Sequence, residues 1–79
     1  MTPDELAART KRRIANLSDR EEMEWLDAAL SGMQHHLDDY RKTGEIAHLG
    51  EMIIAETPIA AVLDDMVKRH EARRQEGLA

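Results

Sequence analysis

The chain has 79 residues, of which 34% are charged and 3% aromatic, with a formal net charge of -5. A chain of this length forms one domain and buries only roughly 60 to 65% of the surface that its unfolded form exposes. The sequence contains no cysteine, which excludes disulfides and thiolate zinc sites and leaves self-association as the usual remedy for a small core. We therefore expect a single helical domain over residues 1–79 that forms a homodimer.

The charge and hydropathy patterns also bear on location and partners. The first residues lack the basic and apolar regions of a signal peptide, and no run approaches the roughly 18 apolar residues of a membrane helix. We expect a soluble, cytoplasmic protein without a membrane partner. Basic residues gather near both ends of the chain, but the negative net charge disfavours binding to nucleic acid.

Start and stop signals divide the chain into four predicted helices, over about 3–16, 19–43, 45–56 and 58–76. Thr2 and Pro3 form an N-cap and a first helical position, and Ser18 is the N-cap of a capping box that opens the second helix. Gly44 follows the second helix as its expected C-terminal stop. These signals, with few β-branched runs, predict an all-α fold.

Thr57-Pro58 should separate the last two helices. Proline lacks a backbone N–H and clashes with the carbonyl four residues earlier, so a helix is expected to end or kink there. Thr57 as N-cap and Pro58 at the first helical position favour a new start. The prediction is a small bundle of three to four helices, in which a helical hairpin is completed by dimerisation.

The second helix carries an apolar seam, and the rest of the chain is expected to pack around it. Its members recur at spacings of three and four, the pattern of a helix that buries one stripe. They are Met23, Leu26, Leu30, Met33, Leu37 and Tyr40.

Trp25 lies away from that seam and beside a strip of small residues. Glycine inside a helix costs about 1 kcal/mol relative to alanine, a cost that makes sense if another backbone comes close at Gly32. Because tryptophan dominates many interfaces, this strip is the predicted partner-binding surface, with packing inside the chain as the alternative. Its residues are Trp25, Ala28, Ala29, Gly32 and His36.

The four histidines raise the question of a metal site. Glu45 and His48 form a Glu-x-x-His pattern, as in ferritin-like metal centres, but these need a second such motif, which a symmetry mate would have to supply. We therefore predict no metal and no cofactor, with Glu45 and His48 as the ligands of the alternative. His70 is expected to be partly buried on the apolar face of the last helix.

No catalytic residue is predicted. Ser18 is a cap, Ser31 lies inside a helix, and the four glycines are isolated, so nucleophile and phosphate-loop motifs are absent from the sequence. We therefore expect a protein without enzymatic activity.

In size, acidity and lack of catalytic residues the chain is similar to the small helical proteins that phages and mobile elements encode to block host machinery, anti-CRISPR proteins among them. The resemblance implies a regulator or inhibitor that binds a host protein. The alternatives are the metal-binding protein and an oligomer that holds a small charged ligand near Arg12, Arg13 and Arg73.

Overall fold

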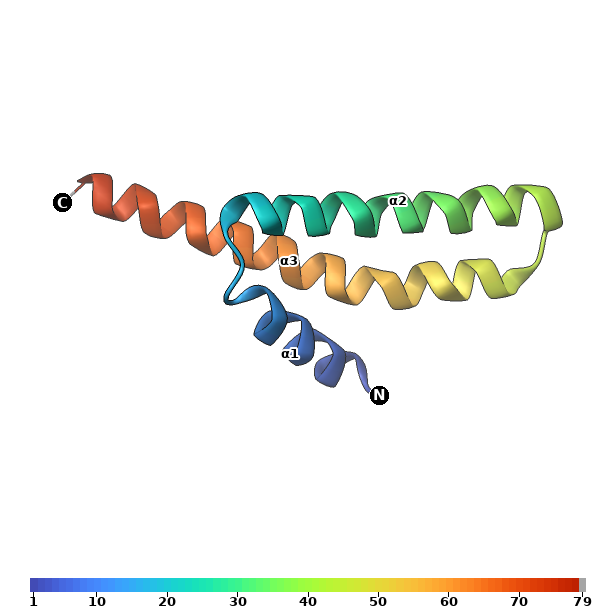
Figure 1. The fold of residues 1–79 in the computed structure, drawn as a ribbon. Helices are drawn as coiled ribbons and strands as arrows, with labels where there is room; N and C mark the ends of the chain where they lie inside the picture. The colour runs from blue at the N-terminus through green and yellow to red at the C-terminus, as the bar shows by residue number, and fades with distance from the viewer. Residues whose placement is uncertain (79) are drawn as a thin grey trace.

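The computed structural model describes residues 1–78 and shows three helices, with no strand among those residues. Helix α1 spans Pro3–Ile14, α2 spans Asp19–Thr43 and α3 spans Ile46–Leu78 (Figure 1). The predicted all-α class is confirmed, and the bounds predicted for α2 agree with the structure. The two predicted C-terminal helices form one continuous helix instead.

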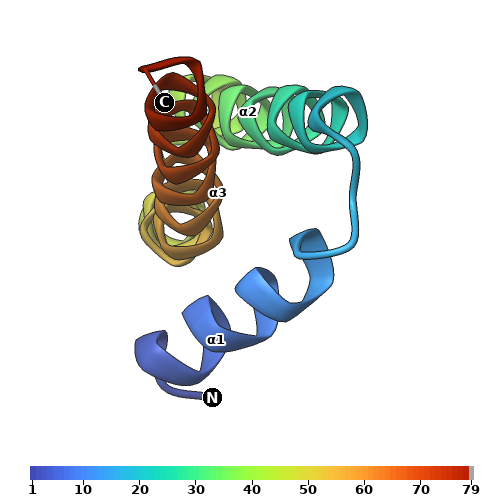
Figure 2. The same ribbon diagram turned by 90° about the vertical axis from the view of Figure 1, so that its left-hand side faces the viewer.

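Helices α2 and α3 form an antiparallel hairpin, and α1 packs across α3 (Figure 1). Figure 2 shows α1 on one side of the hairpin, with no helix of residues 1–78 on the opposite side. Because α3 packs extensively against both other helices, whereas α1 and α2 barely meet, α3 organises the fold. The expectation that the chain packs around the 23–40 segment was wrong.

Local capping sets the ends of α2. The Ser18 hydroxyl accepts from the backbone N–H of Glu21, and the Glu21 carboxylate accepts from the N–H of Ser18, which completes the predicted capping box. Gly44 adopts φ 70°, in the left-handed region, and its N–H donates to the carbonyl of Tyr40 at 2.7 Å. The tight turn at Gly44 therefore folds α3 back along α2.

Pro58 lies inside α3, so the predicted break after Thr57 is wrong. The carbonyl of Ile54 loses its helical donor, but Ile54 is exposed and water can replace that bond. Ile59 and Val62 follow within one turn and are buried in the core. Each such side chain contributes about 1.5 to 3 kcal/mol on burial, which together offset a proline cost of about 3 kcal/mol.

The hydrophobic core is small and lies where all three segments meet. Its buried members are Ile14, Leu26, Ile59 and Val62, and the half-buried residues around it are Leu17, Trp25, Ala29, Met33 and Met66. The predicted α2 seam is only partly correct, because Met23 and Leu30 are 54% and 48% exposed. These two residues are seven apart, so they share one edge of α2, while Leu26 and Met33 face α3.

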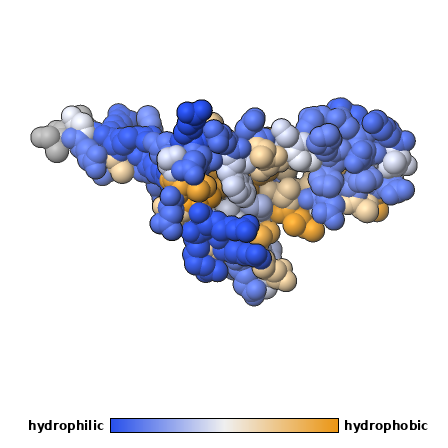
Figure 3. Space-filling view, viewed as in Figure 1, coloured by the Kyte–Doolittle hydropathy of each residue, from blue (hydrophilic) through white to orange (hydrophobic). Residues whose placement is uncertain are grey.

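The molecule is elongated, with principal extents of 54 × 23 × 17 Å. Figure 3 shows hydrophobic side chains gathered along α3 beside α1, whereas the outer surface of α2 is largely hydrophilic. Ile53 and Ile54 are exposed and line a shallow groove with Met1 and Leu6. By length and composition alone, α3 also qualifies as a helix that could cross a membrane, over Ile46–Gly77.

Candidate functional site

The predicted partner-binding strip does not lie in one environment. Trp25 and Ala29 are half-buried and pack against the core, whereas Ala28 and Gly32 are exposed. A Cβ placed on Gly32 would meet nothing within 4 Å, so no other part of residues 1–78 comes close there. His36, the last residue of the strip, faces α3 instead.

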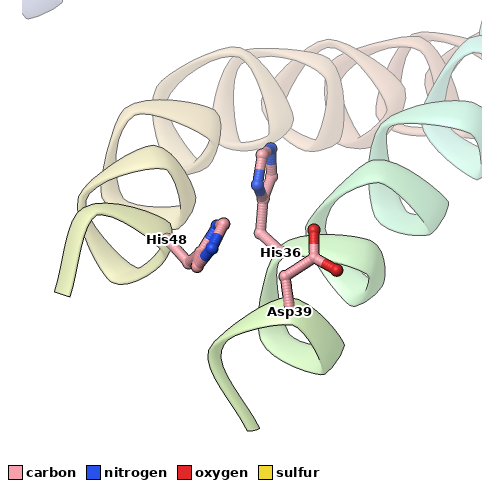
Figure 4. Close-up of side chains that lie close together, drawn as sticks. All are labelled: His36, Asp39 and His48. Carbon is pink, nitrogen blue, oxygen red and sulfur yellow. The ribbon is translucent and has the colours of Figure 1, made fainter. Parts of the chain in front are cut away.

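A cluster of two imidazoles and one carboxylate lies near the closed end of the hairpin (Figure 4). His36 and Asp39 are three residues apart and share one face of α2, and His48 lies in the first turn of α3. The turn at Gly44 brings the two helices together, so that one ligand atom from each residue lies within 4.8 Å of the others. The two imidazole centroids are 6.3 Å apart.

The polar atoms of this cluster have few partners inside the chain. His36 Nδ1 is buried and has no hydrogen-bond partner in the described part of the chain. His48 Nε2 lies 3.9 Å from the Glu45 carboxylate, which is largely exposed. Imidazole and carboxylate together are the donor set that zinc and similar divalent ions take.

Of the three residues of this cluster, the metal-binding alternative drawn from the sequence named only His48. The sequence predicted no metal, and Glu45 and His48 were the ligands of the alternative, in which a second copy of the chain supplies their missing partners. The structure instead places His36 and Asp39 of the same chain beside His48. The available signal was the Gly44 turn, because antiparallel pairing across it sets residues near 36–40 against residues near 48–52.

A second polar cluster surrounds Arg69 and ties the three helices together. The Arg69 guanidinium donates to the carbonyls of Ile14 and Leu17, both at 2.9 Å. It also donates to Asp19 at 3.0 Å and to Asp65 at 2.8 Å. Since the last carbonyls of a helix have no partner within it, Arg69 acts as a cap for the end of α1.

Glu22 is buried beside this guanidinium, with 1% of its surface exposed. Its Oε2 lies 3.7 Å from Arg69 Nη2 and accepts no hydrogen bond from residues 1–78. Burial, followed by the nearby Asp65 carboxylate, raises the pKa of Glu22 from 4.5 to about 7. In contrast, the hydrogen bond from Arg69 lowers the pKa of Asp19.

The Arg69 cluster borders an open cavity of about 210 Å³. Its lining consists of Asp19, Glu22, Met23, Met66, Arg69, His70 and Arg73. His70 is exposed at this cavity, which corrects the expectation of partial burial. Arg73 pairs with Asp19, whereas Arg12 and Arg13 are exposed and do not line the cavity, so the three arginines proposed to hold a charged ligand do not converge there.

No family model, curated protein or solved structure matches the chain. The arrangement of its own residues is therefore the basis for assigning a function.

Proposed function

We propose that this chain is a non-enzymatic protein that acts by binding other proteins, and that its first partner is a second copy of itself. The observation that carries the proposal is an apolar surface on the hairpin, here called the open face. It comprises Met23 and Leu30 of α2 and Leu63 and Val67 of α3, which are 54%, 48%, 47% and 55% exposed.

The open face lies away from α1. Ala61 of α3 is buried and faces α1. Leu63 is two residues further on, which at 100° per residue turns it about 200° from Ala61. Met23 lies beside Met66 across the hairpin and lines a cavity with it. The open face therefore runs along both helices on the side that no other helix of residues 1–78 covers.

The exposed area suits a second copy of the chain. A compact monomer of this mass, 9.0 kDa, is expected to expose about 4,850 Å². The chain exposes 6005 Å², an excess of roughly 1,150 Å². A stable complex buries roughly 800 Å² on each partner, which is less than this excess. An interface of two open faces is self-complementary and closes as a two-fold dimer.

The chemistry of the buried side chains agrees with a binding role for such a dimer. The hydrophobic core and the Arg69 cluster account for most of the buried side chains, and neither contains an activated nucleophile. The dimer would act as a regulator or inhibitor by occupying a surface of a host protein. The exposed residues Ala28 and Gly32 belong to the surface proposed for that second partner.

The test is the mass of the full chain in solution, measured by analytical ultracentrifugation over a range of concentrations. We expect a dimer of about 18 kDa, twice the chain mass of 9.0 kDa. Leu30→Asp and Leu63→Asp should each give a monomer with unchanged helicity, because both side chains are already half-exposed. Ile53→Asp is the matched control, since it adds the same charge to an exposed apolar residue outside the open face.

Three outcomes would overturn the assignment of the open face. The first is a wild-type monomer at all concentrations. The second is dissociation by Ile53→Asp but not by Leu30→Asp, which would place the interface at the groove beside α1. The third is tight binding of the monomer to phospholipid vesicles, since α3 has the length and composition of a membrane helix.

A further inference from the structure

We propose that His36, Asp39 and His48 bind one zinc ion per chain at the closed end of the hairpin. The proposal is independent of the binding function above, because the three residues belong to a single chain (Figure 4) and none of them is a member of the open face. It differs from the ferritin-like alternative, in which a symmetry mate completes the site.

The ligand geometry needs little adjustment. Zinc–nitrogen and zinc–oxygen bonds of about 2.0 to 2.2 Å on a tetrahedral ion hold neighbouring ligand atoms roughly 3.4 Å apart. The ligand atoms of His36, Asp39 and His48 lie within 4.8 Å of one another. Zinc binding would therefore bring these ligand atoms closer together by at most about 1.4 Å, a change that side-chain torsions can supply without moving the helices.

His36 gives independent support for a ligand at this position. Its Nδ1 is buried with no hydrogen-bond partner among the residues that the structure describes, although most buried polar side-chain atoms have one. A metal ion bound there would give this nitrogen the partner that it lacks among residues 1–78. The two imidazoles favour zinc over magnesium and calcium, which prefer oxygen ligands.

Glu45 is placed to complete or orient the site. Its carboxylate lies 3.9 Å from His48 Nε2, on the residue that precedes α3. Carboxylates beside a ligating histidine commonly fix its ring orientation and raise its basicity. Three protein ligands leave a fourth position for Glu45 or water. The ion would then join the last turns of α2 to the first turn of α3 across Gly44.

The experiment is zinc titration of the full chain, purified with chelator and then dialysed, with binding followed by isothermal calorimetry. Co²⁺ serves as a second probe, because its visible absorption reports tetrahedral coordination. We expect one ion per chain and an increase in melting temperature with zinc. His36→Ala and His48→Ala should each weaken zinc binding at least tenfold, and Glu45→Gln by less.

The matched controls are His35→Ala and His70→Ala, which remove exposed histidines outside the cluster. Both should bind zinc as the wild type does. Circular dichroism of each apo variant distinguishes lost binding from lost folding. The proposal is overturned if no zinc binds, if the His36 and His48 variants bind as tightly as the controls, or if the ratio is one ion per two chains, since that ratio indicates a site shared between copies.

Discussion

At the scale of single residues, the buried carboxylate of Glu22 has the clearest consequence for solution behaviour. Its folded-state pKa is raised to about 7, whereas 4.5 is the ordinary value that applies to the unfolded chain. At a pH between 4.5 and about 7, the Glu22 carboxyl is protonated in the folded chain but ionised in the unfolded chain. The contribution of Glu22 to the free energy of unfolding is therefore fully present below pH 4.5 and falls as the pH rises towards 7.

Glu22→Gln should remove that pH dependence, because glutamine resembles the protonated acid and does not titrate. We expect the variant to match the wild type near pH 4.5 and to be more stable above pH 7, as measured by urea unfolding across this range. Glu24→Gln is the control on the same helix, since Glu24 is exposed. Parallel stability curves for the wild type and the Glu22→Gln variant would contradict the raised pKa of Glu22.

The two polar clusters show why single residues are hard to assign from sequence. Arg69 looks like an ordinary solvated cation of a charged helix, yet its partners Ile14, Leu17 and Asp19 lie at least 50 residues earlier in the chain. Glu22 looks like one more first-turn acid of α2, yet its side chain is buried beside Arg69 and Asp65 of α3. Local spacing contains no information about either contact.

At the scale of elements, local chemistry predicts where helices begin and tertiary packing decides where they continue. The Ser18 capping box and the Gly44 turn involve residues at most four apart, and both were predicted. Pro58 has the same local appearance as a helix start. Whether the helix continues through Pro58 depends on Ile59 and Val62. These two side chains are buried because both α1 and α2 pack against α3.

Pro58→Ala tests this balance between proline strain and packing. Alanine restores the N–H that can donate to the carbonyl of Ile54. It also gives the unfolded chain more conformational entropy, which lowers the free energy of the unfolded state by about 0.4 to 1 kcal/mol. We expect a net stabilisation of about 2 to 2.6 kcal/mol in urea unfolding, which is the proline cost of about 3 kcal/mol less this offset.

Pro3→Ala is the matched control, because Pro3 occupies the first turn of α1, where its missing N–H costs nothing. It should leave the free energy of unfolding unchanged or slightly lower. A loss of stability in Pro58→Ala would mean that α3 needs the proline geometry to contact α1 and α2 together.

At the scale of the whole molecule, the elongated shape connects stability to association. The radius of gyration is 15.2 Å, compared with about 11.6 Å for a compact domain of this length. The two residues of the predicted α2 seam that are exposed in the single chain, Met23 and Leu30, belong to the open face. The sequence pattern thus predicts an apolar stripe on α2, but it does not reveal which residues of that stripe α3 covers.

If the open face pairs two copies, the melting temperature must depend on protein concentration, because association stabilises only the folded chain. We expect the melting temperature of the wild type to rise with concentration in calorimetry. Leu30→Asp should remove that dependence and melt at the temperature of the dilute wild type, since Leu30 contributes little to the core of one chain. Leu26→Asp places a carboxylate in the core itself and should unfold the chain at every concentration. A wild-type melting temperature that is the same at all concentrations would show that the hairpin is stable without a second copy, and the open face would then need a different partner.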